Sequence, residues 1–167
     1  MDFFYCVVSN FADGGNPFNY NRFFEFIQAT ILGYTLLPVG GGSDCIRNGS
    51  TGELKASEYK GFGVNGKEKS HSFTYNGTSR QPTLEQQEEY CKNKIMRDDF
   101  HYWTTIDTNA GQLVKTFQLK PSDVWTVLWP KWKKSWYNKK AADPRIGASV
   151  STNELNKLGI AYEVIEH

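Results

Sequence analysis

The chain has 167 residues, of which 39% are hydrophobic, 15% aromatic and 22% charged, and its formal net charge is +1. This length suffices for a buried core without disulfide bonds, so we expect a single domain over residues 1–167. The near-zero net charge excludes a protein that is basic overall, and any attraction to nucleic acid must therefore be local.

Local composition excludes two further classes of protein. Every apolar stretch is too short to span a membrane, and the N-terminus lacks the basic residues that open a signal peptide. We therefore predict a soluble protein with no membrane partner, either intracellular or associated with a virion, and not secreted by a signal peptide.

The first forty residues predict a strand, a helix and a second strand. Residues 3–9 form a short apolar run rich in β-forming side chains. Asn16 and Pro17 are typical of a helix start, and we expect that helix to run up to Gly33. A second strand over residues 35–39 would then permit a right-handed parallel crossover.

The middle of the chain is predicted to form hairpins. Asparagine–glycine pairs tolerate the positive φ angles of tight turns, and they occur at residues 48–49, 65–66 and 76–77. We expect strands around these turns, near residues 44–47, 52–56, 58–64 and 69–75.

Two capping boxes mark helix starts in the second half. Thr83 with Gln86 predicts a helix that ends near Arg97, and Ser151 with Glu154 predicts a short one. Strands are expected over residues 100–106, 112–119 and 161–165. Helices and hairpins in separate runs predict an α+β domain, with a mixed or mostly antiparallel sheet built from hairpins and about four helices packed on it.

Nothing in the sequence indicates a small-molecule cofactor. Cys6, Cys45 and Cys91 are odd in number and lack Cys-x-x-Cys spacing, which favours free thiols over a disulfide framework or a zinc site. The glycine-rich run at residues 40–43 is followed by neither Gly-Lys-Ser/Thr nor a helix, so we predict a connector and no phosphate loop.

The most concentrated feature is a tryptophan–lysine segment, residues 122–140. Four of the five tryptophans fall within it at spacings of four, three and four, which places their indoles on one helix face. Ser122 can cap this segment, and Pro130 predicts a kink between two short helices. The candidate contact residues are Trp129, Trp132, Lys133, Lys134, Trp136, Tyr137, Lys139 and Lys140.

Three interpretations of the tryptophan–lysine segment remain open. The indoles can pack on the protein's own sheet with the lysines in solvent. They can instead anchor a protein interface, or the rings and ammonium groups can bind bases and phosphates of a nucleic acid. Because a kink would leave one or two indoles exposed, we expect other protein subunits as partners and keep nucleic acid as a candidate.

Asp44, Glu53 and Lys55 form the pattern with the most catalytic potential. On a strand, Glu53 and Lys55 share a face. An aspartate followed by Glu-x-Lys on the neighbouring strand is similar to the pattern of one large class of magnesium-dependent nucleases. In that class two carboxylates hold the cation and the lysine assists charge development. The element order over about residues 17–106 is also similar to the core of that class.

Three observations weigh against the nuclease pattern. The lead-in to Asp44 is rich in glycine and no proline precedes the aspartate, and Glu58-Tyr59-Lys60 repeats the short motif. The sequence therefore predicts a non-enzymatic interaction or assembly protein, a small component of a larger complex such as a viral particle, that uses residues 122–140 as a contact surface. A metal-dependent nuclease with an Asp…Glu-x-Lys site is the alternative.

Overall fold

The fold is described from a computed structural model of the chain, which defines residues 20–38, 42–110, 112–138 and 145–167. Its elements in chain order are α2 (Tyr20–Ile31), β1 (Thr35–Leu36), β2 (Cys45–Arg47), β3 (Ser50–Glu58), β4 (Ser72–Thr78), α3 (Leu84–Met96), β5 (Phe100–Asp107), β6 (Gln112–Leu119), α4 (Pro121–Tyr137), β7 (Ile146–Ser151), α5 (Thr152–Lys157) and β8 (Glu163–Glu166).

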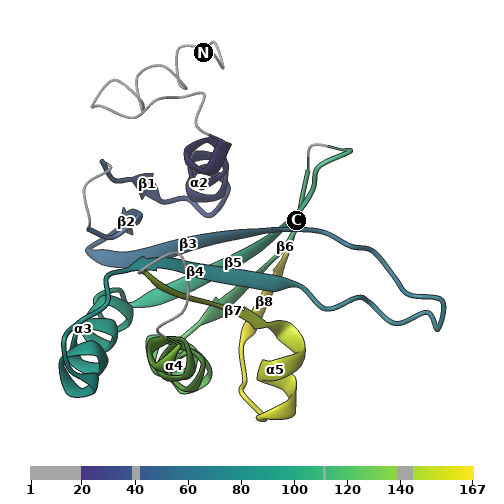
Figure 1. The fold of residues 1–167 in the computed structure, drawn as a ribbon. Coiled ribbons are helices and arrows are strands. Elements are labelled where there is room, and N and C mark those ends of the chain that lie inside the picture. The colour runs from purple at the N-terminus through teal and green to yellow at the C-terminus, as the bar shows by residue number, and fades with distance from the viewer. Residues whose placement is uncertain (1–19, 39–41, 111, 139–144) are drawn as a thin grey trace.

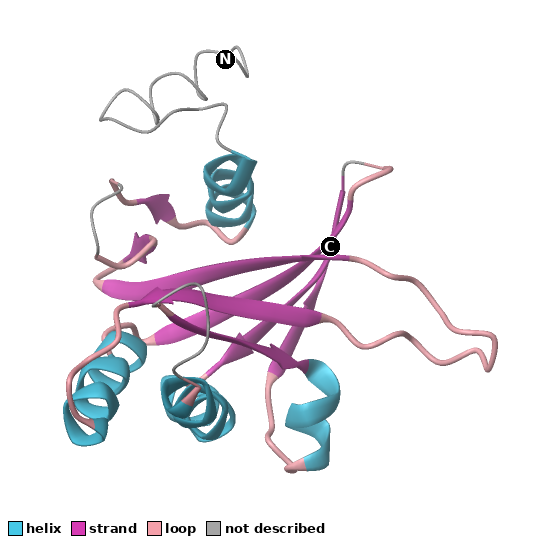
Figure 2. Cartoon of the chain, in the orientation of Figure 1, coloured by secondary structure: helices cyan, strands magenta, loops and turns pink. Residues whose placement is uncertain are grey.

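The fold is α+β, as predicted. A mixed six-stranded sheet has the order β1-β2-β3-β5-β6-β8, in which β3 and β5 are parallel and all other neighbours are antiparallel. β4 and β7 form a second, two-stranded antiparallel sheet. Helix α2 lies on one side of the sheets, whereas α3, α4 and α5 lie on the other (Figures 1 and 2). No helix in the described ranges is long and apolar enough to cross a membrane.

Strand β3 is the part of the sheet that matters most for the site. On its inner edge β3 pairs with β5 along most of its length, from Gly52 to Glu58. On its outer edge β2 pairs only with Ser50, Thr51 and Gly52. Beyond Gly52, no strand among the described residues pairs with this edge, so its outward-facing backbone groups need other partners.

Two buried clusters hold the layers together. The larger lies between the six-stranded sheet, the β4–β7 sheet and helices α3 and α4, and it includes Phe73, Trp103, Leu128 and Trp132. The smaller cluster joins α2 to the opposite face of the sheet through Ala29, Cys45, Leu54 and Tyr102. Aromatic rings fill much of the larger cluster; the rings of Phe73 and Trp103 stack 4.8 Å apart.

Several local predictions are confirmed. Thr83 caps α3 through a complete capping box, and Ser151 does the same for α5. Gly33 follows the end of α2 with a φ of 72°. Asn48 and Gly49 form the β2–β3 turn with φ angles of 51° and 83°. Cys45 and Cys91 are free and buried, whereas Cys6 lies outside the described residues.

Four local predictions are wrong. Ser122 does not cap α4, which begins at Pro121 with Lys120 as its N-cap. Asn76-Gly77 is no turn but lies inside β4, where the register with β7 shifts between Tyr75 and Thr78. Residues 58–64 are no strand of the sheet, because β3 ends at Glu58. Helix α4 is continuous through Pro130, whose ring lies on the exposed side while residues before and after it are buried in the core. Burial of both turns stabilises the helix against the lost hydrogen bond.

Candidate active site

Asp44, Glu53 and Lys55 converge at the outer edge of β3. Asp44 lies just before β2, and its backbone N–H donates to the carbonyl of Gly52 at 3.0 Å. Its carboxylate Oδ2 accepts the backbone N–H of Leu54 at 2.8 Å. The aspartate thus satisfies the first outward-facing group beyond the end of the β2–β3 ladder, and its carboxylate is held beside Glu53 and Lys55.

Glu53 and Lys55 lie on the same face of β3, as predicted. Lys55 Nζ lies 2.5 Å from Glu53 Oε1, and Arg97 Nη2, from the end of α3, lies 3.1 Å from Glu53 Oε2. The Lys55 ammonium also lies 5.3 Å from the ring centroid of Tyr75 on β4. Both carboxylate oxygens of Glu53 therefore have cationic partners, and an aromatic ring supports the lysine.

A cleft of about 390 Å³ opens over this edge. It is lined by residues 53–58 of β3, by Glu25 and Gln28 of α2, by Tyr75 of β4 and by Lys94 of α3. Side chains from the helix on one face of the sheet and from β4 and α3 therefore contribute to the same cleft.

The charges in the cleft influence one another strongly. Burial, reinforced by the charge of Glu53, raises the pKa of Asp44 to about 7. Burial acts in the same direction on Glu53, but the nearby ammonium of Lys55 outweighs it and lowers the Glu53 pKa. Burial alone would lower the pKa of Lys55, yet Glu53 and Asp44 raise it, so the lysine stays protonated.

The oxygen donors of Asp44 and Glu53 fit a hard divalent cation. No group of three or more His, Cys, Asp or Glu side chains in the described ranges is arranged to hold a metal. Magnesium nevertheless needs only one or two protein carboxylates, because waters and substrate phosphates complete its shell. Because burial is the largest cause of the raised pKa of Asp44, a cation bound there would have to displace the proton of this carboxyl group.

A buried hydrogen-bond network supports the floor of the site. Trp103 Nε1 donates to the Tyr75 hydroxyl at 2.7 Å, and that hydroxyl lies 2.7 Å from His101 Nδ1. His101 Nε2 lies 3.0 Å from the carbonyl of Ile95, so this nitrogen carries the proton and Nδ1 accepts from Tyr75. Burial lowers the pKa of His101, which keeps the imidazole neutral. The network fixes the ring over which Lys55 lies.

Gln28 is a cleft residue that the sequence analysis missed. Its side chain is only 1% exposed, and neither amide atom has a hydrogen-bond partner among the described residues. The buried residues described in α2 are Arg22, Phe26, Gln28 and Ala29, whereas Ile31 is exposed. A glutamine within an aliphatic and aromatic helix carries no sequence signal that would mark it as buried.

The tryptophan–lysine segment is only partly on the surface. Trp132 is fully buried, and Trp125, Trp129 and Trp136 are half-buried against the larger cluster. Lys133, Lys134 and Tyr137 are exposed. Lys139 and Lys140 lie outside the described residues. The segment thus contributes both to the core and to the surface.

Comparison with known proteins adds no assignment: the sequence matches no protein-family model and no curated protein.

The first prediction concerns the charge of Asp44 in metal-free protein. The folded chain holds the Asp44 proton more tightly than the unfolded chain does, so this group's contribution to stability is present below about pH 4 and is lost as the pH rises to about 7. With chelator at pH 8, we expect Asp44→Asn to raise the Tm by a few degrees, at roughly 2–4 °C per kcal/mol. At pH 4 the wild type and Asp44→Asn should have the same Tm. Glu58→Gln, which lies outside the carboxylate pair, should leave the Tm unchanged at both pH values.

The second prediction concerns Gln28. Replacing an unpaired buried amide by an apolar group of similar size removes a desolvation penalty, so Gln28→Leu should leave the unfolding free energy unchanged or raise it by about 1 kcal/mol. Gln87 is a matched control, because it is equally buried but its Oε1 accepts the Gln81 N–H at 2.7 Å and its Nε2 donates to Ser79. Gln87→Leu should cost about 1–3 kcal/mol in denaturant unfolding. An equal loss in both variants would show that Gln28 is also paired.

Proposed function

We propose that the protein is a metal-dependent nuclease that hydrolyses phosphodiester bonds in the cleft beside β3. One observation carries this proposal: Asp44 is held against the outer edge of β3 next to Glu53 and Lys55, and these two side chains line the cleft. Two carboxylates beside a lysine provide what phosphodiester hydrolysis needs, namely cation ligands and a fixed positive charge.

Each residue of the site has a separate role in this proposal. Asp44 and Glu53 would hold a divalent cation, which when bound would polarise the phosphodiester and the attacking water. Lys55, protonated and held by Glu53 and the Tyr75 ring, stabilises negative charge that develops on the phosphate oxygens. Gln28 lines the cleft, and its buried amide has no hydrogen-bond partner among the described residues.

The preorganised backbone strengthens this assignment. The hydrogen bond from Leu54 N–H fixes the carboxylate of Asp44, and strand pairing with β5 fixes Glu53 and Lys55. Groups that are already oriented require little rearrangement as charge develops in the reaction.

The third prediction tests the nuclease directly. We expect cleavage of a labelled DNA duplex only with Mg²⁺ or Mn²⁺, and Lys55→Ala should lower the rate about 100-fold or more. Calorimetric titration should show that Asp44→Asn and Glu53→Gln lose Mn²⁺ binding, whereas Lys55→Ala retains it. Glu89→Gln removes an exposed carboxylate of α3 that does not line the cleft, and this variant should retain both properties. Full activity in chelator, or in Glu53→Gln, would contradict the proposal.

A second candidate function is an assembly contact through the tryptophan–lysine segment. The exposed Lys133, Lys134 and Tyr137, close to the half-buried Trp129 and Trp136, favour it. Aromatic side chains are enriched where one protein surface meets another, and aromatic rings beside cationic groups are common where a protein binds single-stranded nucleic acid.

The fourth prediction tests this contact. If the segment binds a second chain or a nucleic acid, replacing Lys133 and Lys134 by glutamate should abolish self-association in light scattering, or weaken nucleic-acid binding equally across sequences and flatten its salt dependence. A wild-type monomer at high concentration, together with unchanged nucleic-acid binding in the double variant, would remove this function.

A further inference from the structure

Residues 59–71, here called the arm, leave the sheet between β3 and β4 and extend well beyond it (Figure 1). The two halves of the arm pair with each other as a short antiparallel ribbon that contains one β-bridge. Lys69 N–H donates to the carbonyl of Gly61 at 2.9 Å, and Gly63 N–H donates to that of Lys67 at 2.7 Å. These bonds flank the antiparallel bridge between Phe62 and Glu68. The backbone hydrogen bonds give the arm a defined shape.

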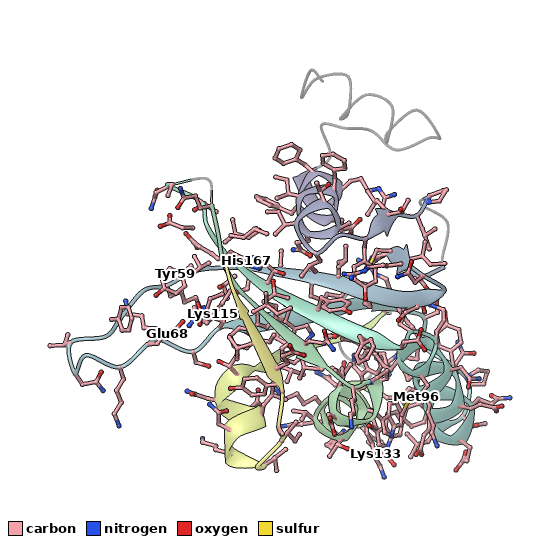
Figure 3. All side chains as sticks on the ribbon, turned by 180° about the vertical axis from the view of Figure 1, so that it is seen from behind. Tyr59, Glu68, Met96, Lys115, Lys133 and His167 are labelled. Atoms are coloured by element: carbon pink, nitrogen blue, oxygen red, sulfur yellow. The ribbon has the colours of Figure 1, made fainter. Side chains whose placement is uncertain are left out.

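Contacts at its base fix the direction of the arm. Tyr59 N–H donates to the carbonyl of Ile106 at 2.7 Å, and the Tyr59 ring stacks on that of His71 at 5.4 Å. Glu68 lies 3.0 Å from His71 Nε2 and 2.8 Å from Lys115 Nζ on β6. Figure 3 shows Tyr59, Glu68 and Lys115 together where the arm meets the sheet. The arm is therefore anchored on both of its strands.

Beyond this base, the arm exposes apolar side chains. The side chain of Phe62 is 64% exposed and that of Val64 is fully exposed. Neighbouring exposed apolar groups on a narrow projection gain nothing from the core of the protein itself. They indicate a surface that is buried when a partner binds.

The arm also concentrates positive charge. Lys60, Lys67 and Lys69 are exposed, and the acidic Glu68 is neutralised at the base by Lys115. Lys67 and Lys69 are the sequence neighbours of Glu68. Because successive side chains of a strand point to opposite faces, both lysines lie on the opposite face of the ribbon from Glu68. Across the ribbon that face carries only glycine, and the two ammonium groups are open to a phosphate backbone.

The arm continues the line of the candidate active site. Glu58, the last residue of β3, lines the cleft, and the arm starts at the next residue. A polymer lying along β3 would therefore meet the arm immediately beyond the cleft. Phe62 lies directly across the ribbon from Glu68, so its side chain and those of Lys67 and Lys69 lie on opposite faces of the arm. A ribbon with an apolar side chain on one face and lysines on the other is complementary to a nucleic acid, whose phosphates surround less polar base edges.

We propose that the arm inserts into the major groove of a DNA duplex whose backbone lies in the cleft. This inference rests on the proposed nuclease function and names its substrate class. A two-stranded ribbon fits a B-form major groove about 12 Å wide, where apolar side chains can contact thymine methyl groups. The lysines of the arm bind the phosphates on either side. The major groove of duplex RNA is deep and narrow and does not admit such a ribbon.

Binding of the full chain to a fluorescent 30-base-pair duplex in chelator, where cleavage is blocked, is the fifth test. Replacing Lys60, Lys67 and Lys69 by alanine should weaken DNA binding about tenfold or more and reduce the slope of log K against log salt by about 2.7. Phe62→Ser with Val64→Ser should weaken binding without changing that slope, because no charge is removed. A matched control replaces three exposed lysines elsewhere, Lys92, Lys120 and Lys157, and should bind as the wild type.

The outcomes separate this inference from the nuclease proposal. Arm variants that bind DNA with wild-type affinity and slope overturn the arm proposal, even if metal-dependent cleavage is intact. Arm-dependent DNA binding without metal-dependent cleavage retains the arm as a DNA-binding element and overturns the nuclease. Equal losses on duplex RNA and duplex DNA overturn insertion into the major groove. Because the arm substitutions are exposed, unchanged melting temperatures are expected and confirm that the variants are folded.

Discussion

The unpaired outer edge of β3 is the constraint on which the candidate site depends. Strand β2 stops pairing at Gly52, and at that residue the two strands and β5 approach closely: a Cβ on Gly52 would lie 2.9 Å from the Tyr102 ring and 3.0 Å from Cys45 Sγ. A side chain there would displace the Tyr102 ring or the Cys45 thiol. The β2–β3 ladder ends at this glycine, and beyond it the Leu54 N–H donates to the carboxylate of Asp44. The Leu54 N–H, which no neighbouring strand pairs with, thus fixes the position of the Asp44 carboxylate.

The alternation of side chains along β3 separates two tasks. Leu54 points into the small cluster with Ala29 and Tyr102 and fastens α2 to the sheet. Its neighbours Glu53 and Lys55 share the other face, where burying charge costs several kcal/mol per ion unless partners compensate. The compensation comes from their mutual ion pair, from Arg97 and from the ring of Tyr75. A strand with both faces buried in an apolar core could not carry the charged side chains of Glu53 and Lys55.

Local chemistry made much of the fold predictable, because a capping box or an Asn-Gly turn involves only neighbouring residues. Thr83 and Asn48 follow this rule. Asn76 and Pro130 do not, since pairing of β4 with β7 and burial around α4 override the local preference. The site was visible as a motif, but two Glu-x-Lys copies looked alike in sequence. The ladder distinguishes them: Glu53 and Lys55 lie beside Asp44, whereas Glu58 ends its strand and Lys60 begins the arm.

The near-zero net charge does not oppose a polyanionic substrate once the charges are located. Glu68 is engaged by Lys115 and His71, and Glu154 by Lys131, so these acids contribute little field at a distance. The exposed lysines of the arm keep their charge free of such partners within the described contacts. A protein can therefore be neutral in total and still present a positive ribbon beside a cleft whose floor holds two carboxylates. Phosphates would be drawn to the ribbon, while the carboxylates would accept them only together with a cation.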